Sequence, residues 1–572
     1  MTETTSQSGH PKGLWYLFGT EMWERFGYYL MLGIFSLYML DGWNNGGMGF
    51  DPAKKSDIYG TYLGLVYLTP FIGGLLADRI LGYRRSIIMG GLMMAAGYFC
   101  LSVHNTTAFY IALLLIILGN GFFKPNISTL VGNLYSTDEL KDKKDAGYNI
   151  FYMGINIGAF ICNFVAAYMR INYGWGHAFA AAGVGMLIGV VIFILGTKHI
   201  KHVDVVKPVK ETDMSTAKIF SLTVVPMFIF GIIGYLIPGN FLGSDTNDAF
   251  IIGCIPVIGF FIYLAFTSEA KESRAIKALL AVFTCVILFF AIFHQNGDAL
   301  TVWAEDHTDR NMPAGIASSA DKVGMAQVVV NNEIVSADQA TFDAKIKELR
   351  AQEAAMPAVS KEEIQAKGKF SNEIATLEKS RKYFSTLPGD QIPESGKDLK
   401  LYSTELYQSI NPFWVVVLTP LVVGVFSWLR RRGKEPSTPT KIAIGLLITA
   451  LSALVMVGAV YATNDLSGKA SSWWLIASYG VITIGELCLS PMGLSLVSKL
   501  SPPRITALMM GGFFLAISVG NKLSGMLSSL WETIPQKQNF FYLNFILVLG
   551  AAIIMFLMLK WLNRVMKENN VH

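Results

Sequence analysis

The sequence predicts an all-α polytopic membrane protein with about fourteen transmembrane helices. Hydrophobic residues make up 52% of the 572 residues and charged residues only 15%, whereas a soluble globular protein carries closer to a quarter of charged residues. Apolar runs long enough to cross a bilayer recur along the whole chain. The short hydrophilic segments between these runs alternate between rich and poor in Lys and Arg, as expected of a chain that crosses a bilayer repeatedly.

Composition and motifs argue against several classes of function. The net charge of +5 is spread over the short segments and forms no compact basic stripe, so nucleic-acid binding has little support. The five cysteines lie far apart inside apolar runs, which predicts buried hydrophobic residues and neither a disulfide framework nor a zinc site. No zinc-protease helix, nucleophile elbow or nucleotide-binding loop motif occurs. We expect no metal and no cofactor, and a membrane-embedded peptidase has little support.

The predicted spans follow one another in order from the N-terminus. They lie near residues 14–40, 56–79, 86–104, 107–133, 147–171, 177–197, 217–238, 248–267, 276–303, 411–429, 441–462, 472–498, 505–530 and 539–562. The polar N-terminus lacks the pattern of a cleaved signal peptide, so the first span is expected to remain as a membrane helix. Nearly all the short segments on one side are basic, which predicts a multi-pass inner-membrane protein with both termini in the cytoplasm.

A weak internal repeat organises these spans. The segments Gly119–Pro125 and Gly485–Pro491 both begin with Gly and end with Pro inside the fourth and twelfth spans, so two six-helix halves match if the seventh and eighth spans form an extra hairpin. Repeated halves that meet at a midplane site are typical of secondary transporters. The expected units are a tail at 1–13, a bundle at 14–197, a linker with hairpin at 198–275, the first helix of the second bundle at 276–303, a hydrophilic insertion at 304–408, the other five helices at 409–566 and a tail at 567–572.

The insertion is expected to form a helical appendage on the outer face. Its middle, Ala337 to Phe384, is rich in Ala, Glu, Lys and Gln and suits two amphipathic helices. Its charges are read as a solvated face, and the sequence predicts no chemistry for it.

The first span carries an unusual polar stripe. Glu21, Glu24 and Arg25 lie in a run that is otherwise apolar, followed by Tyr28 and Tyr29. Each charge near the bilayer centre costs about 2.5 to 3.5 kcal/mol, so such residues usually face a bundle interior or a water-filled path. Helical spacing places the carboxylates, the guanidinium and a phenol on one face. The alternative interpretation is an ion pair that only stabilises packing.

Four further ionisable residues inside the predicted spans are candidates for chemistry. They are Lys124, Glu486, His294 and Asp298. A buried lysine needs a carboxylate to stay charged, so we expect Lys124 to pair with Glu21 or Glu24. A carboxylate that alternates between pairing with a cation and accepting a proton can couple protonation to a conformational change. A static packing bridge is the alternative.

The charges predict a dipolar cavity. Arg25 and Lys124 make one half cationic and Glu486 makes the other anionic, which suits a zwitterion of matching length. Tyrosine and asparagine side chains offer hydrogen bonds and aromatic walls around it. The candidates are Tyr28, Tyr29, Tyr67, Asn156 and Asn411.

The segment after the second span, residues 74–85, has the glycine, acid and paired basic residues of the loop motif of major facilitators. Its charges are expected to hold the inner face closed until the bundle moves. The candidate gating residues are Asp78, Arg79, Arg84 and Arg85.

Four ordered motifs together resemble the proton-dependent oligopeptide transporter family of the major facilitator superfamily, bacterial type. They are Glu21-x-x-Glu24-Arg25-Phe26-x-Tyr28-Tyr29, Phe123-Lys124-Pro125-Asn126, Phe151-Tyr152-x-x-Ile155-Asn156-x-Gly158 and Gly485-Glu486-Leu487-x-Leu489-Ser490-Pro491. The resemblance implies a major facilitator fold of two six-helix bundles plus a hairpin, and proton-driven import of di- and tripeptides across the lipid bilayer. It implies proton coupling by Glu21, Glu24, Arg25, Lys124, His294 and Asp298. It implies substrate binding by Arg25, Tyr28, Tyr29, Tyr67, Lys124, Asn156, Asn411, Glu486, Ser490 and Phe513.

The sequence departs from the family pattern at four positions. Leu32 stands where relatives commonly have a second Arg, and Gly60 where animal members have a functional His. His294 stands where an acidic residue usually precedes Gln, and Phe513 replaces a Trp. The departures leave open an alternative, a carrier of the same fold for another small solute such as nitrate or a modified peptide.

Overall fold

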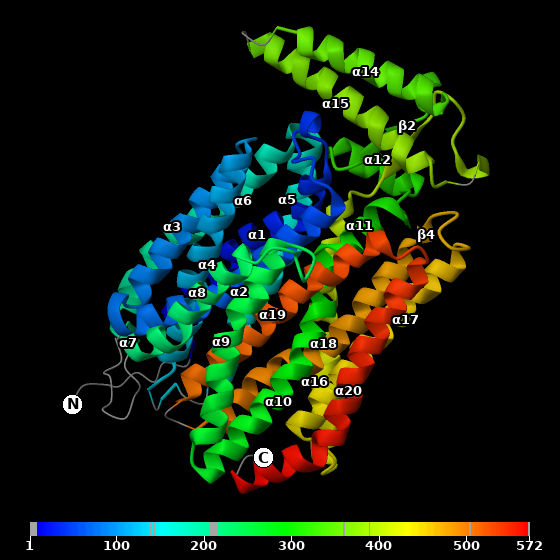
Figure 1. Cartoon of the computed structure of the whole chain (residues 1–572). Coiled ribbons are helices and arrows are strands. Elements are labelled where there is room, and N and C mark those ends of the chain that lie inside the picture. Colours follow the sequence, from blue (N-terminus) through cyan, green and yellow to red (C-terminus); the bar gives the residue numbers. More distant parts are fainter. Residues whose placement is uncertain are drawn as a thin grey trace.

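The computed structural model describes residues 9–137, 139–140, 143–204, 216–357, 361–387, 389–502 and 505–569. Figure 1 shows an elongated bundle of long helices with a smaller helical appendage beyond one end. Parts of the predicted tails and of the predicted linker, residues 1–8, 205–215 and 570–572, lie outside the described residues.

Six long helices form the first half of the bundle. They are α1 (Lys12–Leu40), α2 (Pro52–Leu76), α3 (Tyr83–Leu101), α4 (Thr106–Leu134), α5 (Lys144–Tyr173) and α6 (Trp175–Ile200). The next segments are α7 (Thr216–Ile219), α8 (Val225–Leu236) and α9 (Asp245–Thr267). Helices α8 and α9 pack on each other as a hairpin, and α9 also contacts α2, α10 and α19.

The second half of the bundle comes from the rest of the chain. Its members are α10 (Ala270–Phe293), α11 (Ala299–Asp306), α16 (Ile410–Arg431), α17 (Thr438–Ala462), α18 (Ser472–Leu500), α19 (Thr506–Thr533) and α20 (Lys537–Glu568). The packing of the first half recurs here. Helix α3 packs on α4 and α6 as α17 packs on α18 and α20, and α1 packs on α5 and α6 as α10 packs on α19 and α20. This correspondence pairs α4 with α18, the same pair that the sequence repeat relates.

Twelve helices of the described part of the chain are long and apolar enough to cross a membrane. Helices α1 and α3 are not among these twelve. Helix α1 has its apolar run interrupted by Glu21, Glu24 and Arg25, and α3 has only 19 residues, two of which are Arg84 and Arg85. The number of fourteen spans therefore stays a prediction for these two helices.

The ninth predicted span is not one continuous helix. Helix α10 ends at Phe293, a 3-10 turn follows over His294–Gly297, and α11 resumes at Ala299. Asp298 between them has φ −125° and ψ −92°, outside the helical region. A Cβ at position 297 would lie 2.0 Å from the hydroxyl oxygen of Tyr59, so only glycine allows α2 to approach the turn this closely.

The predicted loop motif at 74–85 is partly helical. Helix α2 continues into a π-helical turn over Ala77–Leu81, which contains Asp78 and Arg79, and Gly82 ends it with φ 77°. Arg84 then pairs with Asp204 beyond α6, with 2.7 Å between Nε and Oδ2. This ion pair connects the loop motif to another segment of the first half.

The insertion folds into a small domain around its own core. It contains α12 (Ala314–Lys322), α13 (Glu333–Ser336), α14 (Gln339–Ala355) and α15 (Lys361–Phe384). Strands β2 (Gln327–Val330) and β3 (Asp398–Leu401) pair antiparallel, and β1 (Thr308–Asp309) pairs parallel with β4 (Ala470–Ser471). The two helices predicted within 337–384 are confirmed as α14 and α15, whereas the short strands were not predicted. In Figure 1, α14 and α15 lie beyond one end of the bundle, which we call the appendage end.

Candidate functional site

A cavity of about 640 Å³ lies between the two halves of the bundle. Helices α1, α2, α4 and α5 line it from the first half, and α10, α16, α18 and α19 line it from the second. Eight of the candidate site residues predicted from the sequence line this cavity. They are Tyr28, Tyr29, Tyr67, Lys124, His294, Asn411, Glu486 and Ser490.

The two halves contribute opposite charges to this cavity. Lys124 of α4 places its Nζ 4.0 Å from the ring centre of Tyr67, a cation–π contact inside the cavity wall. Glu486 of α18 accepts a hydrogen bond of 3.2 Å from the side-chain amide of Asn411, which also donates to Thr483 at 2.9 Å. A zwitterion in the cavity would therefore meet a cation on one wall and a carboxylate on the other.

The charged stripe of α1 lies behind the cavity wall. Arg25 donates from Nη2 to Glu24 at 2.6 Å and its Nε lies 3.3 Å from Glu21. The guanidinium also lies 4.9 Å from the ring centre of Tyr28. Tyr28 and Tyr29 therefore lie between the charged stripe and the cavity. All three charged side chains are buried.

The predicted pairing of Lys124 with Glu21 or Glu24 is not formed in this structure. Arg25 takes both carboxylates because it lies one and four residues further along the same helix. Lys124 lies over the tyrosine ring instead. Arg25 is not among the cavity-lining residues, so its contact with a substrate stays a prediction.

His294 and Asp298 lie on different sides of the helix break. The His294 ring lines the cavity, with its centre 5.7 Å from that of Tyr67. Asp298 is fully buried and forms an ion pair with Lys55 of α2. Ser36 of α1 donates to the carbonyl oxygen of Gly297 at 2.7 Å beside this pair. The second half is thus bonded to α1 and α2 at the appendage end of the cavity.

Further ion pairs join the halves at this end. Lys522 of α19 pairs with Asp57 of α2 at 2.6 Å, and Arg170 of α5 donates to Glu405 at 2.9 Å. Asn163 of α5 donates to the hydroxyl of Ser409 at 3.1 Å. Toward the opposite end, the cavity lining continues to Tyr148 near the start of α5 and Met510 near the start of α19. The cavity is therefore closed off at the appendage end and extends toward the other.

Sequence reasoning missed Lys55, Lys522 and Arg170. Lys55 precedes the apolar run of the second span and Arg170 ends that of the fifth, where basic residues are ordinary at a membrane interface. Neither Lys55 nor Arg170 could therefore be recognised from the sequence as part of an internal ion pair. Lys522 lies inside the thirteenth predicted span, where an intramembrane cation is itself a signal that could have been used.

Besides Arg25, two predicted substrate residues do not line the cavity. Phe513 packs inside the second half with its ring centre 5.7 Å from that of Phe283, and its neighbour Phe514 lines the cavity. Successive residues of a helix point about 100° apart, so a shift of one position exchanges the wall residue for a core residue. Asn156 donates to the carbonyl oxygen of Tyr152 within α5 at 3.0 Å.

The departures from the family pattern also have defined places. Leu32 lines the cavity, so the missing second Arg leaves an apolar patch on its wall. Gly60 lies against α19, where a Cβ would come within 2.9 Å of the Cα of Gly525. Gly60 therefore allows α2 and α19 to pack closely at this position.

A cavity with opposite charges between two repeated halves of a membrane-spanning bundle defines the class of secondary transporters. Residues 84–327 and 401–543, more than half of the chain, match the model of the POT family. The chain belongs to this family.

Proteins with related sequences and structures are transporters. The chain is 29% identical over 575 residues to the di-/tripeptide transporter of Lactococcus lactis subsp. cremoris, which covers 98% of this chain and 97% of that protein. It is 28% identical over 540 residues to the peptide transporter YePEPT of Yersinia enterocolitica, covering 91% and 88%. A crystal structure of a peptide transporter POT in complex with sulfate is 27% identical, with a TM-score of 0.73 and coverage of 98% and 96%.

Proposed function

We propose that this chain imports di- and tripeptides together with protons by alternating access. The observation that carries the proposal is the placement of Lys124 and Glu486 on opposite walls of one cavity, each from a different half. A short peptide carries a carboxylate at one end and an ammonium group at the other, and the relatives above are named peptide transporters. In this proposal Lys124 binds the carboxylate and Glu486 the amine.

Backbone groups of the peptide are bound by uncharged side chains. The hydroxyl groups of Tyr28, Tyr29, Tyr67 and Ser490 and the amide of Asn411 surround the cavity and can donate or accept. These groups recognise features common to all short peptides. Selectivity for individual peptide side chains is therefore expected to be loose.

Protonation is proposed to act on the carboxylates that the structure pairs with cations. A proton on Glu24 or Glu21 weakens its pair with Arg25, and a proton on Asp298 weakens the pair with Lys55 that joins the halves. His294 lines the same cavity and is proposed as a further residue of the proton pathway. Loss of the pair between Asp298 and Lys55 lowers the cost of separating the halves at the appendage end.

The orientation in the membrane follows from the same proposal. The appendage end is the outer side, both termini are cytoplasmic, and the structure represents a conformation whose cavity extends toward the cytoplasm. The protein is then a multi-pass protein of the inner membrane, driven by the inward proton gradient.

Proteoliposomes with an inward proton gradient test this function. We expect accumulation of labelled dialanine, and its loss in Glu24→Gln. Uptake that stays the same after an uncoupler collapses the gradient would contradict proton coupling. Intact labelled peptide recovered from the lumen would exclude hydrolysis by a membrane peptidase.

Leu32 on the cavity wall is the observation that favours a different solute. With leucine in place of the second Arg, Lys124 is the cation among the described residues that line the cavity. A smaller anion or a modified peptide could use that single cation. A panel of dipeptides competing with dialanine decides between these cargoes, and failure of every dipeptide to compete would exclude peptides as the cargo.

A further inference from the structure

The appendage belongs to the second half by its chain connections. It is inserted between α11 and α16, which both lie in that half. Lys382 of α15 forms an ion pair of 2.6 Å with Asp306 at the end of α11. Lys469, in the turn before α18, donates to the backbone oxygen of Asp306 at 2.9 Å and lies 4.2 Å from the ring centre of Tyr383. These contacts fix one part of α15 to the second half.

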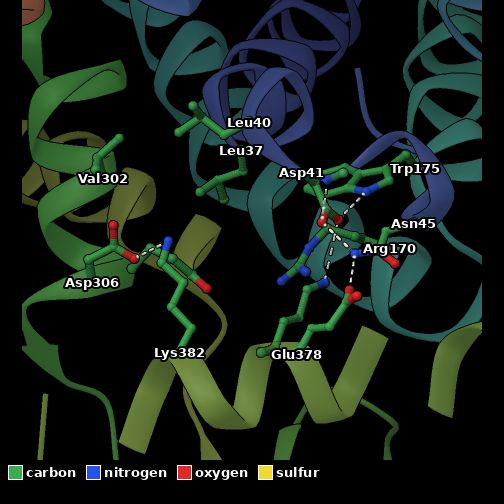
Figure 2. Close-up of a pocket in the computed structure, with 13 residues that line it drawn as sticks. Leu37, Leu40, Asp41, Asn45, Arg170, Trp175, Val302, Asp306, Glu378 and Lys382 are labelled. Atoms are coloured by element: carbon green, nitrogen blue, oxygen red, sulfur yellow. Dashed lines mark hydrogen bonds and ion pairs between the residues drawn. The ribbon is translucent and has the colours of Figure 1, made fainter. Parts of the chain in front are cut away.

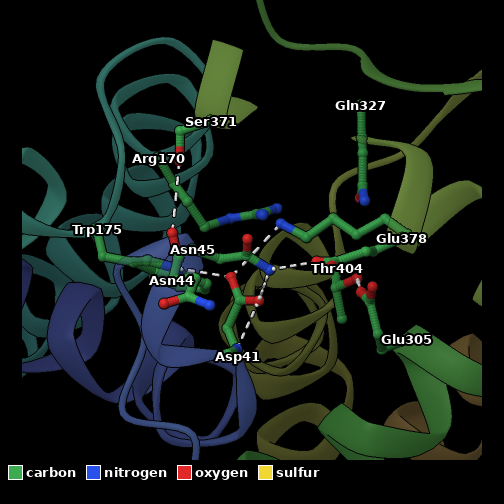
Figure 3. A network of polar contacts seen from close by, with 12 residues as sticks. Asp41, Asn44, Asn45, Arg170, Trp175, Glu305, Gln327, Ser371, Glu378 and Thr404 are labelled. Atoms are coloured by element: carbon green, nitrogen blue, oxygen red, sulfur yellow. Dashed lines mark hydrogen bonds and ion pairs between the residues drawn. The ribbon is translucent and has the colours of Figure 1, made fainter. Parts of the chain in front are cut away.

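The same helix also contacts the first half. Asn45, in the turn between α1 and α2, donates to Glu378 at 3.1 Å and accepts from Arg350 of α14. Lys379 lies 3.6 Å from Asp41 at the end of α1. Figure 3 shows Asp41 at the end of α1, Asn45 of the following turn and Glu378 of α15 converging. No chain connection joins the appendage to the first half, so its contacts with the first half are the ones that can separate.

Helix α15 lies over the closed mouth between the halves. A cavity of about 200 Å³ separates it from the ends of α1 and α11 and is lined by Leu40, Val302 and Lys382 among others. In Figure 2, α15 crosses this cavity and carries Lys382 to Asp306 on one side and Glu378 toward Asn45 on the other. A neighbouring cavity of about 260 Å³ shares these three lining residues and reaches Lys55, the partner of Asp298.

We propose that α14 and α15 form an outer latch, anchored on the second half and gripping the α1–α2 turn of the first. The latch must release that turn whenever the halves separate at the appendage end, so it favours the closed outer mouth. The inference rests on the alternating access proposed above. Its grip consists of the partly exposed charge pair of Lys379 with Asp41 and the hydrogen bonds of Asn45. Such contacts are individually weak and can therefore break and reform within a transport cycle.

Two cross-linked variants distinguish a latch from a passive appendage. Asn45→Cys with Glu378→Cys, bridged by a short reducible bis-methanethiosulfonate, joins the appendage to the first half. Asp306→Cys with Lys382→Cys, bridged in the same way, joins it to its own half and is the matched control. We expect the first bridge to reduce dialanine uptake by at least about tenfold, with recovery after reduction, and the control bridge to leave uptake unchanged. Full uptake with the first bridge closed would overturn the latch.

A second measurement does not depend on transport. Spin labels at Tyr173→Cys and Trp473→Cys report the separation of the halves, because both side chains are exposed near the appendage end. We expect Glu378→Ala with Lys379→Ala to increase the population with a long distance. Lys345→Ala, which removes an ion pair of 2.8 Å within α14, is the control and should not. An unchanged distance distribution in the double variant would contradict the latch even if peptide uptake itself were absent.

Discussion

Arg25 and Lys124 have different surroundings, although both are cations of the first half. Arg25 is held by two carboxylates of its own helix behind the cavity wall. Lys124 faces the cavity against an aromatic ring. At the residue scale, we therefore expect Arg25 to contribute to stability and Lys124 to contact the ligand.

Arg25→Gln and Lys124→Gln should separate these two roles. Removing Arg25 leaves buried carboxylates without a cation, which typically costs about 3 to 5 kcal/mol. We expect a clearly lower thermal unfolding midpoint in detergent for Arg25→Gln. Lys124→Gln should keep the midpoint and lose peptide binding, measured by microscale thermophoresis. Equal destabilisation by both variants would refute this division.

The pair of Lys55 with Asp298 gives a second residue-scale prediction. Lys55→Met leaves a fully buried carboxylate without its cation, and we expect a loss of stability of about 3 to 5 kcal/mol. Lys55→Met combined with Asp298→Leu removes both charges and should recover most of that loss. The measurement is the free energy of unfolding of the three proteins. A double variant less stable than the single variant would argue against a charge effect.

His307, beyond the end of α11, gives a pH dependence. Its ring lies 5.3 Å from that of Trp303 and 5.7 Å from that of Trp531, and burial lowers its pKa from 6.5 to about 4. The folded state therefore holds His307 neutral. The stability that this contributes is fully present above pH 6.5 and is lost as the pH falls toward about 4.

The His307→Phe variant isolates this contribution. We expect its unfolding midpoint to fall less than that of the wild type when the pH is lowered from 6.5 to 4. The quantity to compare is the difference between the two proteins at each pH, because other groups titrate in both. Parallel curves for the two proteins would show that His307 contributes nothing to the pH dependence.

At the scale of elements, the contact between α2 and α19 depends on glycines. A Cβ at Gly525 would lie 2.4 Å from the backbone oxygen of Ser56, and one at Gly60 would lie 2.9 Å from the Cα of Gly525. Gly525→Ala should push the helices apart and cost about 1 to 3 kcal/mol. Gly424→Ala in α16 is the control, since nothing lies within 4 Å of its added Cβ. An equal thermal midpoint for both variants would exclude tight packing at Gly525.

Elements were predictable from the sequence where one physical signal dominates. Long apolar runs located most spans, and amphipathic patterning located α14 and α15. The break after Phe293 was not predicted, because hydropathy measures apolar content and the flanking segments remain apolar. The turn forms where His294 to Asp298 supply a polar stretch with a glycine, and the decisive close contact with Tyr59 comes from a distant helix.

Partners of charged residues were harder to predict than the residues themselves. The sequence identified Glu21, Arg25, Lys124 and Glu486 because charge inside an apolar run is expensive. It did not identify that Arg25 satisfies both carboxylates within α1. The partners Lys55 for Asp298 and Asp57 for Lys522 depend on helices more than two hundred residues apart in the chain.

At the scale of the whole molecule, the halves are bonded to each other at the appendage end and enclose one central cavity. The cavity volume of about 640 Å³ falls in the usual range for small-molecule sites. A substrate held between Lys124 and Glu486 must fit between both walls with the outer mouth closed. In the proposed binding mode, we therefore expect the space between the two walls to limit the length of the peptide.

A ladder of alanine peptides measures this limit. We expect peptides of two and three residues to compete with labelled dialanine for uptake. Peptides of four and five residues should not compete, because the closed end leaves no space for further residues. Competition by the pentapeptide as strong as that by the dipeptide would contradict enclosure on both sides.

The pairing within α1 also bears on how the chain enters the membrane. This helix is synthesised before its neighbours, so its charges cannot wait for a later helix to neutralise them. Arg25, Glu24 and Glu21 lie within one helical turn and can satisfy one another as soon as the helix forms. The charges of the first helix can therefore neutralise one another while the helix inserts into the membrane. The positive charge of Lys124 arrives later in synthesis, free to face the cavity.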